Sequence, residues 1–197
     1  MEEDSQQNRE EERHDNDDER PPNQVQDHHR RVVIRAGPSG NQKRGKTWSE
    51  IFPGFIDRIL VSYGTSIRSI QILYRTIDGE LILMPKHGGE GTKFTSIQFK
   101  IGECLTKISG YLSYWQRNIK SIKFETESAI YGPYGKEEGT PFLFEIKDGV
   151  INGFHGRSDK TRLRSIGILI DTNIPKPDSP TKNTSCFGFI DNNHQQP

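Results

Sequence analysis

The chain has 197 residues, enough for one ordinary domain with tails, and its 27 basic and 27 acidic side chains balance. Two cysteines, Cys104 and Cys186, do not indicate a disulfide scaffold, and no apolar run is long enough to span a bilayer. The charge is unevenly distributed, because residues 1–30 hold 11 acidic and 4 basic residues, which leaves 23 basic and 16 acidic after them. The later part is therefore net positive and is expected to attract anionic partners.

Residues 1–30 have a composition typical of a disordered, acidic arm. Val25 is their one aliphatic residue after the initiator methionine, so the segment lacks the apolar surface that would offset the entropy of ordering. The segment is also too polar for a secretory signal. We therefore expect a cytoplasmic or nucleocytoplasmic protein with no membrane partner.

Residues 31–171 alternate apolar and polar residues in short runs, as half-buried strands do. The apolar positions of these runs are Ile59, Val61 and Tyr63; Ile97, Phe99 and Ile101; Phe142, Phe144 and Ile146; and Ile166, Ile168 and Ile170. Asp78-Gly79 and Asp148-Gly149 suit tight hairpin turns, so antiparallel neighbours are expected. No stretch shows a helical apolar stripe, and the pattern predicts an all-β domain of about ten to twelve strands.

Residues 172–197 form a proline-containing polar tail. Pro175, Pro177 and Pro180 interrupt strand pairing. Phe187, Phe189 and Ile190 make a short apolar patch, which we interpret as part of an unstructured end.

Residues 40–47 match the phosphate-binding loop of nucleotide hydrolases letter for letter. That loop functions between a strand and a helix, whose N-terminal amides hold the phosphates. Here Pro53-Gly54 would stop a helix within two turns. Nucleotide hydrolysis therefore ranks third among the functions considered.

Other catalytic or metal-binding patterns are weak. His87 and His155 lack the partner spacing of a metal site, and Cys104 has no predictable base beside it. The sequence predicts a non-enzymatic protein without metal or cofactor, and no nucleic-acid partner is expected.

A set of glycine-rich turns and strand motifs resembles a plant jacalin-related lectin over residues 31–171. In chain order these are Gly37-Pro38, Trp48, Lys86-His87-Gly88-Gly89, Ile108-Ser109-Gly110-Tyr111, residues 121–126, Tyr131-Gly132-Pro133-Tyr134-Gly135, residues 137–142, residues 149–158 and residues 163–167. The resemblance implies a β-prism of three four-stranded antiparallel sheets with pseudo-threefold symmetry.

The resemblance also implies a sugar site at one end of the prism, where main-chain amides and one carboxylate bind neighbouring hydroxyls. Gly45 takes the position of the family's loop glycine. The last turn contributes Thr161, Arg162 and Arg164, with His87, Gly88 and Gly89 in a neighbouring loop.

This last turn departs from the family pattern, because Lys160 and Arg164 replace a glycine and an aspartate. A guanidinium has only donors and cannot accept the hydroxyl hydrogens that a carboxylate accepts. Asp159 is a candidate substitute acceptor. We expect five cations to gather at the mouth of the prism: Arg44, Arg157, Lys160, Arg162 and Arg164.

Two functions stay open on this evidence. The first is a lectin module with an altered turn, whose glycan is either of the mannose type or anionic. The second is a lectin scaffold that has lost sugar binding and binds protein partners in plant stress or defence, an analogy from the fold alone. The sequence leaves the oligomeric state open, a homo-oligomer included.

Overall fold

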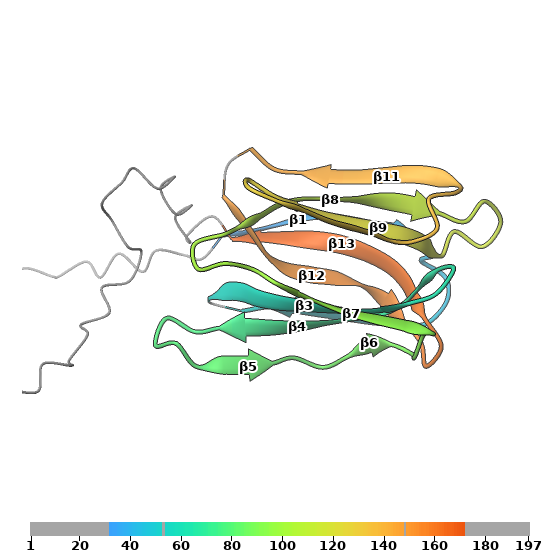
Figure 1. Ribbon diagram of the computed structural model, residues 1–197. Helices are drawn as coiled ribbons and strands as arrows, with labels where there is room; N and C mark the ends of the chain where they lie inside the picture. The colour runs from blue at the N-terminus through green and yellow to red at the C-terminus, as the bar shows by residue number, and fades with distance from the viewer. Residues whose placement is uncertain (1–31, 53, 148, 172–197) are drawn as a thin grey trace, which may run out of the picture. The chain divides into compact units, whose positions relative to one another are not determined.

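The computed structural model describes residues 32–52, 54–147 and 149–171, which form thirteen β-strands and no helix (Figure 1). The predicted arm and tail lie outside these residues. The strands are β1 (Val33–Gly40), β2 (Lys46–Ile51), β3 (Phe55–Tyr63), β4 (Ile67–Arg75), β5 (Leu81–Leu83), β6 (His87–Gly88), β7 (Lys93–Gln98), β8 (Leu105–Leu112), β9 (Ile119–Thr126), β10 (Ile130–Gly135), β11 (Thr140–Glu145), β12 (Val150–Ser158) and β13 (Leu163–Asp171). In the described part of the chain there is no helix long and apolar enough to cross a membrane.

The strands form three antiparallel sheets, with the orders β1-β13-β12-β2, β10-β9-β8-β11 and β5-β4-β3-β7. In the third sheet β6 also pairs with β4, so β5 and β6 are two pieces of one outer strand. Pro85 lies between the pieces and has no N–H to donate to the ladder, which explains the break. The predicted β-prism of three four-stranded sheets is thus confirmed.

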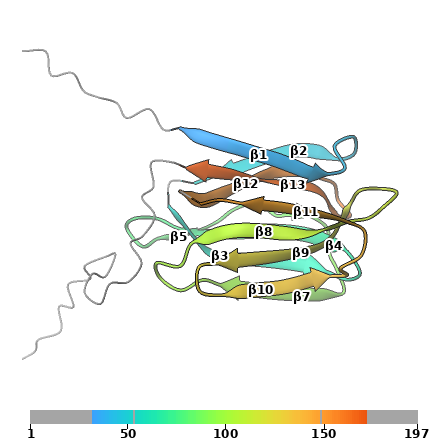
Figure 2. The same ribbon diagram turned by 90° about the horizontal axis from the view of Figure 1, so that it is seen from above.

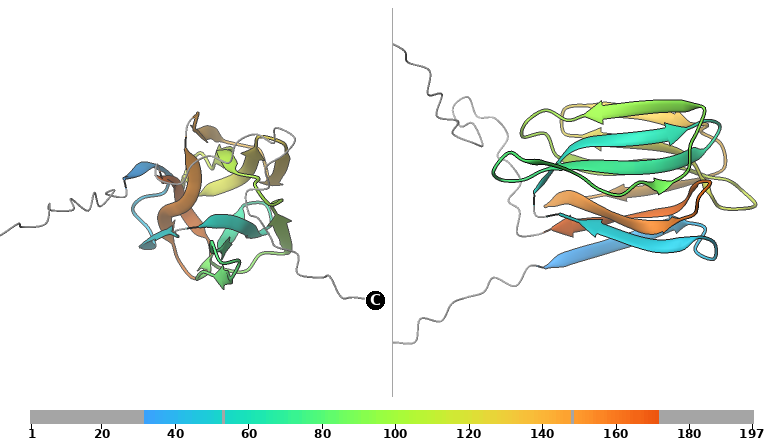
Figure 3. Two further views of the ribbon diagram at one scale, coloured as in Figure 1. Left: turned by 90° about the vertical axis from the view of Figure 1, so that its left-hand side faces the viewer. Right: turned by 90° about the horizontal axis from the view of Figure 1, so that it is seen from below.

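Each sheet has a sequential hairpin at its centre: β12–β13, β8–β9 and β3–β4. Seen along the strands, the three sheets surround a shared core (Figure 3, left), and the strands of all three run along one common direction (Figure 2). Tyr74, Phe124 and Phe154 are among the largest fully buried side chains of this core. In β13 all nine residues are buried, including polar ones, because the strand lies inside its sheet.

The predicted alternation of buried apolar and exposed polar residues holds at Ile59 and Val61 of β3, which are fully buried, but fails at Ser62, which is buried too. It is wrong for Ile101, whose side chain is 74% exposed. Strand β7 ends at Gln98, and a turn at residues 101–102 follows, so the period of two does not extend to Ile101.

The two Asp-Gly dipeptides have different outcomes. Gly79 has a φ of +86° and closes the antiparallel β4–β5 hairpin, as predicted. Gly149 also has a positive φ, +87°, but the strands on either side, β11 and β12, belong to different sheets. The predicted pairing across the second turn is therefore wrong.

The segment that matches a phosphate-binding loop connects two strands. Gly40 ends β1, and Lys46 and Thr47 begin β2. No helix follows whose amides and dipole would hold phosphates, so the segment lacks the structure on which nucleotide binding depends.

Candidate functional site

The loop of residues 41–45 lies against the end of β12. Gly45 has a φ of +81°, and a Cβ atom there would lie 2.5 Å from the Ser158 carbonyl oxygen. Only glycine tolerates both the backbone conformation and this approach. The structure thus brings the predicted loop glycine next to the turn of residues 159–162.

Asn41 organises the same loop. Its side-chain oxygen accepts hydrogen bonds from the amides of Lys43 and Arg44, each at 3.0 Å. Its own amide donates to the Arg164 carbonyl at 2.9 Å, and its Nδ2 donates to the Gln116 carbonyl at 2.8 Å. Asn41 therefore ties the loop to β13 and to the β8–β9 turn.

Asp159 is the acceptor at the centre of the last turn. Its Oδ1 accepts from the Thr161 amide at 2.8 Å, the Thr161 hydroxyl at 2.6 Å and the Arg162 amide at 3.1 Å. Burial raises the pKa of Asp159, but these hydrogen bonds and one from Arg164 together hold it well below its usual range. The group is a carboxylate at neutral pH.

Arg164 points inward instead of toward solvent. Its Nε and Nη2 both donate to Asp159 Oδ2 at 2.5 Å, and Nη1 donates to Asn118 Oδ1 at 2.9 Å. The Arg164 side chain is 11% exposed. The guanidinium at the position of the family's aspartate is thus buried and held in place by hydrogen bonds from Nε, Nη1 and Nη2.

The turn consequently binds a carboxylate of its own chain. The amides of Thr161 and Arg162 point at Asp159, which leaves neither of them free to donate to a sugar hydroxyl. Asp159 lies in the turn, as the sequence suggested, but its two oxygens already accept from three residues. A sugar hydroxyl would have to compete with these internal donors.

The five predicted cations do not share one orientation. Arg157 donates to the carbonyls of Arg44 and Gly45, and Arg164 is buried, so these two brace the site from within. Arg44 and Lys160 are exposed, and Arg162 is half-buried. The expected gathering of all five at the mouth is therefore wrong for Arg157 and Arg164, because their donors face protein acceptors.

The neighbouring glycine-rich loop packs against the same turn. A Cβ on Gly89 would lie 2.4 Å from the Lys160 carbonyl oxygen, so the two backbones touch. His87 stacks on Trp48, with ring centroids 3.9 Å apart, and its Nε2 lies 2.6 Å from Glu50 Oε1. Because His87 is fixed in this way, it supports the loop.

Sequence reasoning missed two residues that shape the site. Glu50 follows Trp48 by two positions in β2, so period-two spacing could have placed both on one face. Asn118 lies 46 residues from Arg164, and no local signal connects them.

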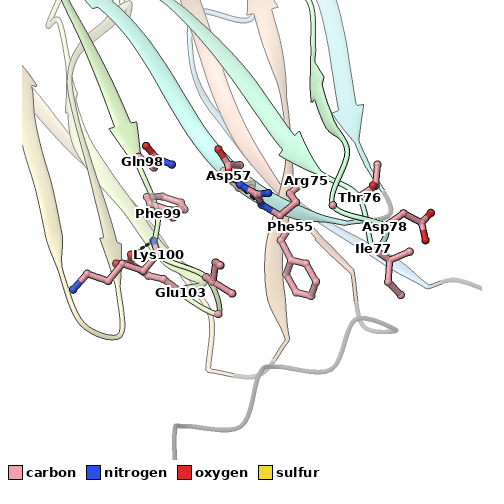
Figure 4. Close-up of a pocket in the computed structure, with 14 residues that line it drawn as sticks. Phe55, Asp57, Arg75, Thr76, Ile77, Asp78, Gln98, Phe99, Lys100 and Glu103 are labelled. Carbon is pink, nitrogen blue, oxygen red and sulfur yellow. Dashed lines mark hydrogen bonds and ion pairs between the residues drawn. The ribbon is translucent and has the colours of Figure 1, made fainter. Parts of the chain in front are cut away.

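Away from this turn, a hollow of about 670 Å³ lies where β3 begins and where β4 and β7 end (Figure 4). Phe55 and Ile77 line it, and Asp57 forms an ion pair with Arg75 at its wall. The pairing neutralises these charges locally, and the hollow is remote from the turn of residues 159–162.

Metal-binding groups are not clustered in the described residues, where no three His, Cys, Asp or Glu side chains lie close enough to hold an ion. The Nε2 atom of His155 is hydrogen-bonded to the Ala36 carbonyl oxygen at 3.0 Å. Burial lowers the pKa of this histidine. Cys104 is buried, as predicted for a structural thiol.

Three sheets around one core, with a glycine-containing loop against a long turn at one end, define a lectin of the β-prism class, a class of carbohydrate-binding modules. A profile of the Jacalin-like lectin domain matches residues 36–169. The chain belongs to the family of jacalin-related lectins.

Known relatives agree with this assignment. An agglutinin from Castanea crenata is 36% identical over 143 residues, which are 68% of this chain and 46% of the agglutinin. Jacalin-related lectin 3 from Arabidopsis thaliana is 35% identical over 161 residues, 77% of this chain and 26% of that protein. The chain thus spans less than half the length of these two relatives.

A solved structure shares both fold and sequence. The mannose-specific jacalin-related lectin from Morus nigra, in complex with mannose, is 33% identical with a TM-score of 0.64, and the match covers 71% of this chain and 94% of that chain. Mannose binding in that complex is a property of the Morus nigra lectin.

Proposed function

We propose that this chain is a non-enzymatic carbohydrate-binding module in which the family's primary sugar position is closed by an internal ion pair. Neutral sugars of the mannose type bind weakly at this position, and the specificity of the module differs from that of the mannose-specific relative.

The Asp159–Arg164 pair carries this proposal. In the family, by the resemblance drawn above, a carboxylate and main-chain amides grip the sugar hydroxyls. Here Arg164 offers only donors, and the Thr161 amide and hydroxyl are bonded to Asp159. A neutral sugar would have to displace a charge-assisted network without regaining a charged acceptor.

Reopening the turn tests the proposal. The triple variant Asp159→Ala, Lys160→Gly, Arg164→Asp frees the amides and restores the acceptor. Titration calorimetry with mannose should show at least about tenfold tighter binding than the parent, since one charged hydrogen bond contributes about 1.5–3 kcal/mol. Lys160→Gly alone is the matched control, because it loosens the turn without supplying an acceptor, and it should bind no better than the parent.

The variants also define the contrary result. A parent that binds mannose as tightly as the triple variant would show that Asp159 yields to the sugar and that the pair does not close the site. Circular dichroism of each variant verifies that the β structure is retained.

A scaffold that binds protein partners is the second candidate function, favoured by the same closed turn. It predicts that no neutral or anionic glycan binds the parent on an array. A role in plant stress or defence and a cytoplasmic or nucleocytoplasmic location stay predictions of the sequence.

A further inference from the structure

The three central hairpins of the prism turn at the same end, and their turns enclose a hollow of about 350 Å³. The hollow is distinct from the Gly45 loop, which does not line it. Its lining comes from all three sheets: Thr65, Ser66, Arg68, Ser113, Trp115, Gln116, Asn118, Lys120 and Arg162. A ligand here would contact one hairpin of each sheet.

The ionisable residues that line the hollow are all cationic. Arg68 comes from β4, Lys120 from β9 and Arg162 from the β12–β13 turn. Within the described residues neither Arg68 nor Arg162 has an ion-pair partner. Two acids interact electrostatically with these cations: Asp159, which is hydrogen-bonded to Arg164, and Glu138, whose pKa is lowered by Lys136 and less strongly by Lys120.

Arg162 has an unmet donor inside the protein. Its Nε is buried, and no hydrogen-bond acceptor for it lies in the described residues. Burial lowers the pKa of Arg162, and the nearby charges of Arg68 and Arg164 lower it further, while Asp159 offsets only part of this lowering. A buried donor without an acceptor is costly, and crowded cations repel one another, so an anion between them would relieve both penalties.

Trp115 is the one large apolar residue among those that line the hollow. The residue is 97% exposed, on the β8–β9 turn, in which Arg117 has a φ of +51°. A fully exposed indole beside hydroxyls and amides suits the amphipathic face of a sugar ring. The side chains of Thr65 and Ser113 are hydrogen-bonding groups along the same lining.

We propose that this hollow binds the anionic substituent of a glycan, a sulfate, phosphate or carboxylate, between Arg68, Arg162 and Lys120, with the sugar ring on Trp115. The inference rests on the proposed carbohydrate-binding function and names its ligand class. The ligand sits beside the closed primary position, whose carboxylate, Asp159, already accepts from Thr161, Arg162 and Arg164.

The test is a titration of the full chain with four probes: galactose 6-sulfate, galacturonic acid, galactose and inorganic sulfate. Indole fluorescence reports binding, since the chain has two tryptophans and Trp115 is the exposed one of them. The variants are Arg68→Gln and Trp115→Ala. Lys147→Gln is the matched control, because it removes one exposed cation that lies two residues beyond the end of β11 and does not line the hollow.

We expect the two anionic sugars to bind at least about tenfold more tightly than galactose, and Arg68→Gln to lose about tenfold, as the loss of one charged hydrogen bond implies. Affinity should fall as salt is raised, since the charges are partly exposed. Trp115→Ala, followed by calorimetry, should weaken the anionic sugars and leave inorganic sulfate unchanged. Lys147→Gln should match the parent.

Other results overturn the inference in separable ways. Galactose binding that equals that of the anionic sugars, and is unaffected by Arg68→Gln, refutes the anionic hollow while carbohydrate binding stands. If inorganic sulfate binds as tightly as the sulfated sugar, and Trp115→Ala changes neither affinity, the hollow is a site for simple anions. That result refutes the glycan as its ligand. No binding of any probe refutes this inference alone, because the proposed function is tested separately by mannose binding to the parent and to the triple variant.

Discussion

The ion pair between Asp159 and Arg164 affects both the stability of the fold and access to the primary sugar position. Asp159→Ala leaves the Arg164 guanidinium, 11% exposed, with Asn118 as its remaining acceptor. The free energy of unfolding should fall by about 2–3 kcal/mol, below the range for fully buried pairs because Asp159 is partly exposed. Urea unfolding measures this change. Thr161→Ala removes one hydroxyl donor and should cost less.

The same pair has a defined pH dependence. The pKa of Asp159 is lowered in the folded protein, so its stabilisation is fully present above the unfolded value of about 3.9 and is lost as pH falls through the folded value. The difference in unfolding free energy between parent and Asp159→Ala should be constant from about pH 5 to 7 and shrink only in stronger acid. A difference that already shrinks near pH 6 would contradict this assignment.

At this scale the sequence could place residues in the turn but could not orient them. Arg164 was recognised as a departure from the family pattern, and Asp159, five positions earlier, as a candidate acceptor. Their pairing depends on how the turn curls, and on Asn118 from another sheet. Such partners are set by tertiary structure, which no local pattern encodes.

At the level of elements, two glycines distinguish the cost of an unfavourable backbone conformation from the cost of a steric clash. Gly88 in β6 has a φ of +123°, and a Cβ there would lie 1.9 Å from the Arg68 carbonyl oxygen. Gly79 has a φ of +86° with nothing within 4 Å. Gly88→Ala should destabilise by about 3 kcal/mol or more, and Gly79→Ala by about 1 kcal/mol, in thermal or urea unfolding. Equal losses would show that the β4–β6 contact is loose.

The β2 strand supplies a further test. Lys46→Ala with Thr47→Ala should leave ATP binding and turnover at background, because both residues lie in a strand and no helix follows them. A coupled phosphate-release assay measures this. Turnover in the parent that disappears in the double variant would restore the nucleotide-hydrolase interpretation.

Strand patterns identified core positions such as Ile59 and Val61 in β3. They failed where pairing is not local. The turn at Gly149 has the conformation expected of a hairpin, yet it passes the chain from one sheet to another. A dipeptide encodes a turn, whereas the long-range packing of the strands determines which sheet each one joins.

At the level of the whole molecule, the chain divides by composition. The domain boundaries at residues 30 and 171 stay predictions of the sequence. Deleting residues 1–30 should leave the thermal midpoint nearly unchanged, because this segment has few apolar side chains to contribute to a core. Differential scanning calorimetry of the two chains measures the midpoint. A drop of several degrees would move the boundary toward the N-terminus.

The three-sheet architecture was accessible only through the resemblance to a family. Alternation and turn residues indicated antiparallel strands, but β5 and β6 divide one outer strand, and the three hairpins converge at one hollow. Neither feature follows from periodicity. Both depend on how sheets pack on a common core.

The internal ion pair makes residues 159 and 164 epistatic. An arginine at 164 without Asp159 would bury a guanidinium that lacks its counter-charge, while Asp159 facing an aspartate at 164 would set two carboxylates against each other. Each single charge exchange therefore costs stability, and a mutational path between a sugar-accepting turn and this one passes most easily through an uncharged residue. Libraries that vary one of the two positions at a time would miss functional combinations, so directed evolution of new specificity should randomise both together.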